Sequence, residues 1–303
     1  GLSVLFLVRA GLLVQTLRNL SNVDLGYNPD GLLQISIDTR ASGYKQGQVG
    51  GVYNQLLARL HGIPGVRSAT AIRNPLMRGA MSRAHYDIPG VELAPDETWD
   101  AAQVGSSFFD TMGIPLVSGR TFTDADATRD QFPVIVSESF AKRYFPGKDP
   151  IGVRLGRQQR TEIIGVVRDA RLSGVRVPSG VFMYNLLEKE PDRINALEVR
   201  FSGDPAAVVP AIRAEIRQVH PRLLLSVTTM RRHIDDSIAK ERMVAATSTF
   251  FSVLGLLLAS IGVFGVASYA VTRRTNELGI RLALGASPGS VILESLRGTL
   301  VMF

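Results

Sequence analysis

A run of thirty residues without a charged side chain extends from Met243 to Thr272. Three charged residues, 240–242, precede the run, and two arginines, 273–274, follow it. The hydrocarbon core of a bilayer is crossed by about 20 apolar helical residues. The helices in the core of a soluble protein are usually shorter and apolar on one stripe only. The run therefore predicts a transmembrane helix.

Four small residues within this run fall on one face of the predicted helix. Ser252, Gly255, Ala259 and Gly262 are spaced at i, i+3, i+7 and i+10. Small side chains let helix backbones approach closely in lipid. We interpret this face as a site of helix packing, with the alternative that glycine is simply frequent in membrane helices.

Apolar sequence also lies at both ends of the chain. Residues 1–18 read as the end of a first transmembrane helix, and residues 289–303 as the start of a further one. Between the central run and the last segment, residues 273–288 form a short polar loop. We expect the protein to continue past Phe303 with at least one more span.

A helix is predicted to begin before the apolar run. Thr229 is a suitable N-cap, and nothing between Arg232 and Thr272 breaks the helical pattern. Residues 229–272 would then form a stalk and transmembrane helix of roughly 66 Å, at about 1.5 Å per residue. Three opposite-charge pairs at i, i+4 are expected near its start: Arg231–Asp235, Arg232–Asp236 and Asp236–Lys240.

The long middle of the chain, residues 19–228, has the mixed signals of an α+β domain. Residues 32–38 alternate as a strand, a helical stripe follows between Val49 and Leu60, and residues 62–72 predict a turn and a second strand. The same order returns late, where Asp204 and Pro205 begin a helix between two further strands. We predict a split βαβ, ferredoxin-like part whose halves are far apart in sequence.

The segment between these halves, about residues 74–195, is rich in glycine and proline and in short strand patterns. The stretches "PVIVS", "TEIIGVV" and "VFMYNLL" predict strands, and "ESFAKRYF" predicts one short helix. We interpret the segment as an inserted, mostly β subdomain.

The formal net charge of +7 is spread over the chain with both signs interleaved. Such a distribution lacks the basic stripe that binds phosphate backbones, so we expect no nucleic-acid partner. The sequence contains no cysteine, which excludes disulfides, thiolate metal sites and a cysteine nucleophile.

No residue set predicts catalysis or a metal site. Ser287 lies in a G-x-S-x-G match, but it follows a helical pattern and precedes a proline, unlike a nucleophile elbow. The loop Thr123–Asp130 lacks the glycine and the final glutamate of a calcium loop, so we expect a polar surface loop. Residues 147–148 lack the rest of a phosphate loop. The four histidines are not spaced as paired zinc ligands: His61, His85, His220 and His233.

Several segments occur in the order found in a known family. They are "VDLGYNPDGLLQISIDTRASGY", "LLARLHGIPGVRSAT", "FFDTMGIPLVSGRTFTDAD", "VIVSESFAKRYFPGKDPIGVRL", "TEIIGVVRDAR" and "RRTNELGIRLALGAS". The sequence resembles the FtsX-like permease family with its MacB-like periplasmic core domain, and most closely the duplicated orphan permeases of acidobacteria. The resemblance implies an extracytoplasmic α+β core flanked by transmembrane helices, in a multi-pass protein of the bacterial inner membrane.

The resemblance also implies a role for the polar loop. In that family the loop carries the pattern E-[IL]-G-x-R-x-A-x-G-A and docks on an ATPase subunit. Leu278 stands where isoleucine is common in the family. The residues implied in ATPase coupling are Glu277, Gly279, Arg281 and Gly285.

The function that follows from the resemblance is that of a permease subunit, not an enzyme, in an ABC-type complex. It would transmit the motion of an ATPase to the extracytoplasmic domain, as in efflux or export. ATP would bind to the separate ATPase subunit, and the chain would pair with a second permease copy or a duplicated half. The alternative is an orphan, membrane-anchored binding or signalling protein without an ATPase.

Overall fold

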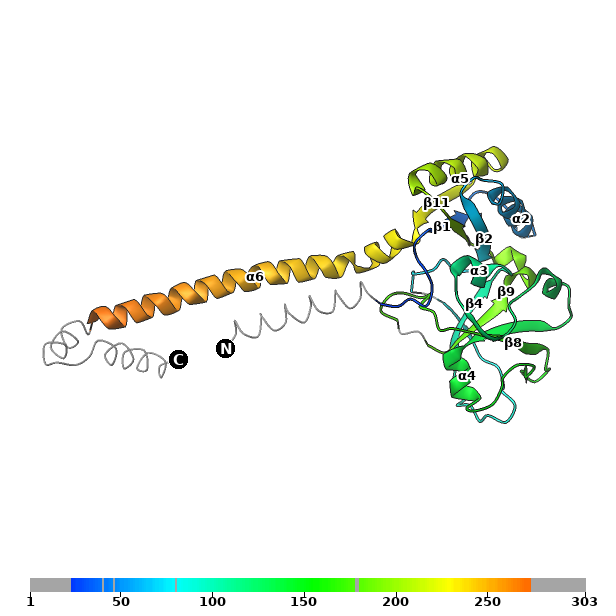
Figure 1. Cartoon of the computed structure of the whole chain (residues 1–303), viewed down its shortest axis with the longest axis horizontal. Helices are drawn as coiled ribbons and strands as arrows, with labels where there is room; N and C mark the ends of the chain where they lie inside the picture. The colour runs from blue at the N-terminus through cyan, green and yellow to red at the C-terminus, as the bar shows by residue number, and fades with distance from the viewer. Residues whose placement is uncertain (1–22, 40, 46, 80, 178–179, 274–303) are drawn as a thin grey trace. The chain divides into compact units, whose positions relative to one another are not determined.

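The computed structural model describes residues 23–273, except for residues 40, 46, 80 and 178–179 (Figure 1). The chain separates into two compact units. One comprises Leu20–Ala239, and the other comprises Gly1–Asn19 with Lys240–Phe303. The predicted domain boundaries, which divide the chain more finely, stay predictions.

The described elements alternate between strands and short helices. The strands are β1 (Leu32–Asp38), β2 (Val66–Ile72), β3 (Ser82–Ala84), β4 (Trp99–Val104), β5 (Leu116–Gly119), β6 (Phe132–Ser137), β7 (Arg154–Leu155), β8 (Thr161–Val167), β9 (Phe182–Leu186), β10 (Ala196–Phe201) and β11 (Leu224–Thr229). The α-helices are α2 (Val49–Leu60), α3 (Phe108–Met112), α4 (Glu138–Tyr144), α5 (Pro205–Val219) and α6 (Met230–Arg273). Three 3₁₀ turns complete the set: η1 (Asp124–Ala127), η2 (Leu187–Lys189) and η3 (Pro191–Arg193).

Four strands in the order β11-β1-β10-β2 form an antiparallel part of the sheet. Helix α2 connects β1 to β2, and α5 connects β10 to β11, so each βαβ unit has a strand of the other unit between its own strands. This is the split βαβ order that the sequence predicts. The two helices lie together against one face of these strands (Figure 1).

The apolar pattern of each element explains this packing. Leu33 and Ile35 on β1 and Leu197 on β10 point to the face that α2 and α5 cover, because side chains alternate between the faces of a strand. Helix α5 starts where the sequence predicts, since the Asp204 side chain accepts a hydrogen bond from the main-chain N–H of Ala206 at 2.8 Å.

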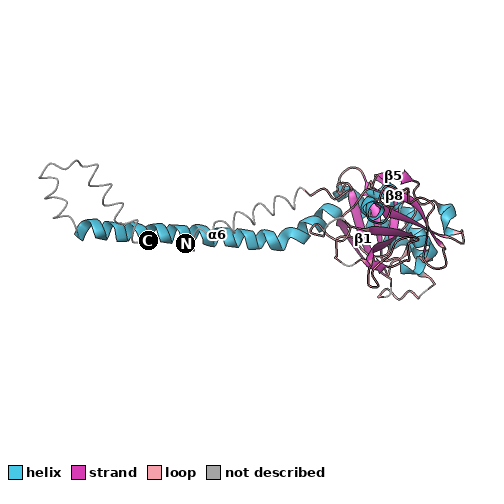
Figure 2. Cartoon of the chain, turned by 90° about the horizontal axis from the view of Figure 1, so that it is seen from below, coloured by secondary structure: helices cyan, strands magenta, loops and turns pink. Residues whose placement is uncertain are grey.

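The remaining strands continue the same sheet in the order β4-β9-β6-β8-β5. They join the first four through a single register pair, Ile72 opposite Val104. The predicted strands "PVIVS", "TEIIGVV" and "VFMYNLL" are confirmed as β6, β8 and β9, and the predicted helix is α4. Strands β3, β4, β5 and β7 and helix α3 were not predicted. Figure 2 shows the strands of this sheet gathered in one body.

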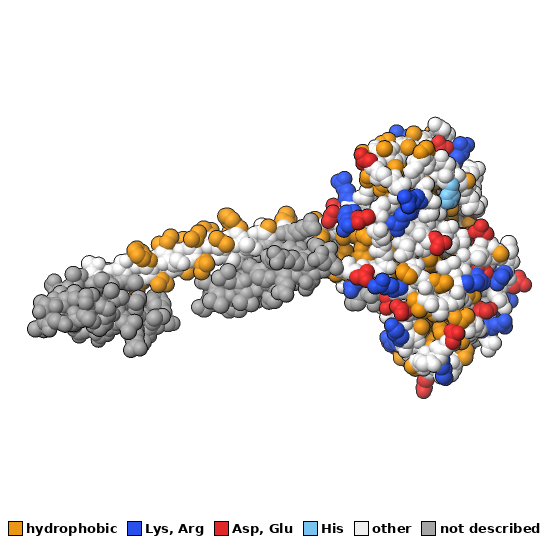
Figure 3. Space-filling view, in the orientation of Figure 1, with side chains coloured by type: hydrophobic (Ala, Val, Ile, Leu, Met, Phe, Trp, Pro, Cys, Tyr) orange, Lys and Arg blue, Asp and Glu red, His pale blue; other side chains and the backbone are white. Residues whose placement is uncertain are grey.

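Helix α6 is one continuous helix of 44 residues, Met230–Arg273, as the sequence predicts (Figure 2). Within it, Ala246–Val266 is long and apolar enough to cross a membrane, with 21 residues and a mean hydropathy of 2.2. Apolar side chains are exposed along this helix (Figure 3). Phe250, Leu258 and Phe264 are among its exposed residues. Of the described residues, only this helix meets the length and hydropathy of a span.

Candidate functional site

The four residues that the family pattern implies in ATPase coupling are Glu277, Gly279, Arg281 and Gly285. They lie outside the described residues. Their role stays a prediction.

The predicted packing face is located on α6. The Ser252 side chain is buried, and its hydroxyl donates to the carbonyl oxygen of Ser248 at 2.7 Å, while Gly255, Ala259 and Gly262 are exposed. A methyl group added at Gly255 or Gly262 would meet no described atom within 4 Å. The described part of the chain leaves room for another helix on these glycines, and packing there stays a prediction.

The start of α6 is built into the sheet domain. The main-chain N–H of Arg232 donates to the Thr229 hydroxyl at 3.2 Å, which confirms the predicted N-cap. Met230, Ile234 and Ile238 recur at i, i+4 and i+8 and are buried. Met230 and Ile234 belong to the core on the sheet face opposite α2 and α5. The first turns of α6 are therefore fixed by apolar packing as well as by the cap.

One predicted charge pair at this position is wrong. The Arg231 guanidinium binds the Asp30 carboxylate, with Nη2 at 2.7 Å from Oδ1 and 2.9 Å from Oδ2, instead of pairing with Asp235 along the helix. The contact with Asp30 is bidentate, a geometry that favours a guanidinium–carboxylate pair. The Arg232–Asp236 pair is present at 4.0 Å, and the described side chains do not include Lys240 of the third pair.

Arg200 on β10 ties the segment before β1 to the rest of the domain. Its guanidinium donates to four main-chain carbonyls at 2.6 to 3.0 Å, those of Asn28, Asp30, Thr111 and Met112. Arg168, in the loop after β8, donates to the Asp24 carboxylate at 2.7 Å. We call residues 24–31 the strap. Through these contacts and the Arg231–Asp30 pair, the strap touches α6, β10 and the loop after β8, and Arg200 links it to α3.

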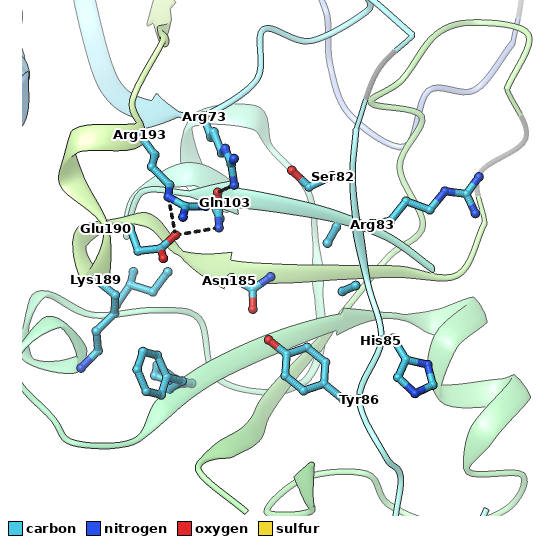
Figure 4. A pocket seen from close by; sticks show the side chains of 15 residues that line it. Arg73, Ser82, Arg83, His85, Tyr86, Gln103, Asn185, Lys189, Glu190 and Arg193 are labelled. Atoms are coloured by element: carbon cyan, nitrogen blue, oxygen red, sulfur yellow. Dashed lines mark hydrogen bonds and ion pairs between the residues drawn. The ribbon is translucent and has the colours of Figure 1, made fainter. Parts of the chain in front are cut away.

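A groove of about 470 Å³ opens over β4 and β9. Its lining includes Arg73, Gln103, Asn185, Glu190 and Arg193, and we call it the polar groove (Figure 4). In Figure 4 the side chains of Arg73 and Arg193 lie together at one end, with Gln103 and Glu190 beside them. Two other cationic side chains of the lining, Arg83 and Lys189, point away from the middle of the groove.

Hydrogen bonds fix the arginines of the polar groove. Arg73 Nη1 donates to Gln103 Oε1 at 2.7 Å, and Gln103 Nε2 donates to Glu190 Oε2 at 3.0 Å. Arg193 Nε lies 3.3 Å from the same carboxylate oxygen. Burial lowers the pKa of Arg73, and the charge of Arg193 lowers it further. Arg193 thus contacts the Glu190 carboxylate directly, whereas Arg73 is linked to it only through Gln103.

The sequence did not indicate this groove. Its residues come from five separate segments, and none is part of a motif with a fixed spacing. Only the register of β4 and β9, which places Gln103 opposite Asn185, brings the central residues together.

One prediction about polar residues can be compared with the structure. The loop Thr123–Asp130 is not wholly a surface loop, because the Asp126 side chain is fully buried. Asp126 accepts two hydrogen bonds from Arg120, at 2.6 and 2.9 Å, and others from Thr123. Burial alone raises the pKa of Asp126, but these hydrogen bonds and the charge of Arg120 outweigh it and lower the pKa to about 2. Among the described residues no group of three or more histidines and acidic side chains is placed to hold a metal ion.

A family model and several curated relatives match parts of the chain. A family model for the MacB-like periplasmic core domain matches residues 1–219. The macrolide export ATP-binding/permease protein MacB of Aggregatibacter actinomycetemcomitans is 26% identical over 205 residues, which are 64% of this chain and 31% of that protein. The probable syringafactin export ATP-binding/permease protein SyfD of Pseudomonas syringae pv. tomato is 28% identical over 200 residues, 62% of this chain and 30% of that protein.

The matched region is about a third of the length of these curated relatives. Among solved structures, the periplasmic region of MacB from Actinobacillus actinomycetemcomitans is 17% identical, with a TM-score of 0.47 over 71% of this chain and 94% of that one. The family model covers well over half of the sequence. The chain therefore belongs to the family of the MacB-like periplasmic core domain.

Proposed function

We propose that the chain is the permease component of an ABC-type transport complex and transmits the motion of an ATPase to an extracytoplasmic domain. Family membership supports this function, as do two relatives whose names describe ATP-binding/permease export proteins. The observation on which the proposal rests is the continuity of α6. One helix, Met230–Arg273, contains both the residues packed in the sheet domain and the apolar segment Ala246–Val266.

The transmission works through the start of α6. An unbroken helix passes a displacement along its length better than a loop does, because its hydrogen-bonded turns resist bending. Met230 and Ile234 connect α6 to the packed core of the sheet domain, and Arg231 connects it to the strap through Asp30. Packed cores shift as units. A tilt of α6 would therefore move the sheet domain.

At the other end of α6 the coupling loop, residues 273–288, contacts the ATPase. Glu277 and Arg281 are spaced at i, i+4 and orient the loop, while Gly279 and Gly285 leave room for the partner surface. ATP binds to the ATPase subunit and no cofactor binds to this chain. The protein is a multi-pass inner-membrane protein, and it works with a second permease copy that packs on the small-residue face of α6.

The test is association with an ATPase. The tagged, full-length protein is crosslinked in its native membrane, and bound proteins are identified by mass spectrometry. We expect a subunit with a phosphate loop to be recovered with the wild type. Glu277→Arg and Arg281→Glu, made singly, should each lower recovery and ATP hydrolysis about tenfold or more. Arg222→Glu, an exposed change in the sheet domain, is the control and should change neither.

The outcomes separate the parts of the proposal. Equal recovery of the ATPase with both loop variants would contradict the role of the loop and leave the permease function standing. Recovery of no ATPase with the wild type would favour the orphan, membrane-anchored binding or signalling protein instead.

A further inference from the structure

We infer that the polar groove binds a small organic anion that carries a carboxylate or phosphate group. The groove lies in the sheet domain and shares no residue with the coupling loop or α6. The inference goes beyond the proposed function, and it holds whether or not an ATPase partner exists.

The first observation is the unused hydrogen-bonding capacity of Arg73. A guanidinium has five N–H donors, and the Arg73 side chain uses one of them, toward the neutral Gln103 amide. Among the described residues no carboxylate lies within 4.0 Å of its nitrogens. The side chain is only partly exposed. A guanidinium in this state is suited to two-pronged binding of an oxyanion.

The second observation is the local excess of positive charge. Glu190 is the one carboxylate of the groove lining, and it already binds Arg193 and Gln103. Asp192 lines an adjoining cavity that the two arginines share, where its carboxylate accepts the main-chain N–H of Gly47 at 2.9 Å. Burial and then the charge of Arg193 lower the pKa of Arg73, and the nearby charge of Glu190 offsets this only in part. A bound anion would supply the missing charge.

The third observation is that the arginines are already in place. The chain of contacts Arg73–Gln103–Glu190–Arg193 holds both guanidiniums at one end of the groove (Figure 4). Binding an anion there would not require these side chains to become ordered first, which lowers the entropic cost of association.

The middle of the groove suits a neutral, polar body attached to the anionic group. Asn185 is partly buried, and its side-chain amide makes no hydrogen bond to another described residue. The Tyr86 hydroxyl points toward it, and Ala101 and Pro133 add apolar surface. The volume of about 470 Å³ lies in the range of pockets for small molecules, roughly 300–1,000 Å³.

The experiment is a calorimetric titration of the full-length protein in detergent, at constant ionic strength. Citrate is the carboxylate probe and inorganic phosphate is the second probe. We expect saturable binding of at least one probe with a Kd of about 1 mM or tighter. A preference for one probe identifies which oxyanion the groove takes.

Two variants test whether the anion binds at the arginines of the polar groove. Arg73→Gln should weaken it tenfold or more, since it removes a charge-assisted, two-pronged contact. Arg67→Gln, an exposed change at the other end of β2, is the control and should alter the Kd by less than about twofold. Circular dichroism verifies folding. Should Arg73→Gln not fold, Arg193→Gln replaces it with the same expected loss, because that side chain is half exposed.

Two results would overturn the inference. One is the absence of saturable binding of either probe to the wild type. The other is an equal Kd for the wild type and for the folded arginine variant.

Discussion

Glu198 makes the stability of the sheet domain depend on pH. Its side chain is fully buried on β10, between Gln34 on β1 and Thr70 on β2. Gln34 Nε2 donates to Glu198 Oε1 at 2.8 Å, and Oε2 has no hydrogen-bond partner among the described residues. Burial raises the pKa of Glu198 to about 8, against smaller lowering effects from Gln34 and Arg200.

The direction of the pH dependence follows from this pKa. The folded protein keeps the proton of Glu198 up to about pH 8, whereas an unfolded glutamate with a pKa of 4.5 loses it much earlier. Between these values the folded state binds more protons, so the free energy of unfolding falls as the pH rises. The full loss is about 5 kcal/mol, reached above the folded pKa.

Urea unfolding of the full-length protein in detergent, followed by the fluorescence of Trp99, measures this effect from about pH 5 to about pH 9. Trp99 is the only tryptophan and is buried in the sheet domain. Glu198→Gln keeps the shape of the side chain and removes its proton equilibrium. Relative to this variant, the wild type should lose about 4 kcal/mol across the range, because part of the full loss already occurs below pH 5.

The control is Glu92→Gln, which removes an exposed carboxylate. Its free energy of unfolding should depend on pH in the same way as that of the wild type. If Glu198→Gln and the wild type lose stability in parallel with pH, the argument from the buried carboxyl group is refuted.

Three further predictions concern the strap and α6. Gly26→Ala should lower the free energy of unfolding by about 3 kcal/mol or more, because φ is +76° and the new methyl would lie 2.0 Å from the Asp169 carbonyl oxygen. Gly90→Ala is the control, with φ of +75° and no atom within 4 Å of the new methyl. It should lower the free energy of unfolding by about 1 kcal/mol in the same urea assay. Arg200→Ala should cost about 2 to 3 kcal/mol, since four carbonyls lose their donor, and a cost below about 0.5 kcal/mol would contradict the structural role of the strap. Gly262→Leu should leave urea unfolding unchanged and lower the fraction of self-associated protein in sedimentation experiments; an unchanged fraction would argue against packing on this face.

The elements that the sequence predicted are those whose pattern is strong within a short window. Strand β1 alternates from Leu33 to Asp38, α5 has both an N-cap and a proline at its start, and α6 has no breaking residue. Strand β3 and helix α3 are only 3 and 5 residues long, too short to show a period. Their formation depends on the neighbouring strands.

The polar groove and the strap could not be predicted for a related reason. Arg73 and Arg193 are 120 positions apart in the sequence, and the pairing of β2 with β10 brings them to one edge. Arg231 has an acidic neighbour at i+4, so the sequence favours a helical pair, and only the fold places Asp30 closer. Local patterns indicate elements, whereas contacts between distant segments appear only in the folded chain.

Transmission of ATPase motion to the sheet domain is measured as a distance between two copies of the chain. Because residues 1–303 contain no cysteine, Gln55→Cys on the exposed side of α2 provides a single site for a spin label in this part of the protein. Distances between labels are recorded in the ATPase complex with ADP and with a non-hydrolysable ATP analogue. We predict a shift of about 5 Å or more between the two nucleotides, which Glu277→Arg abolishes. The same distance with both nucleotides, in a complex that hydrolyses ATP, would contradict the proposed function.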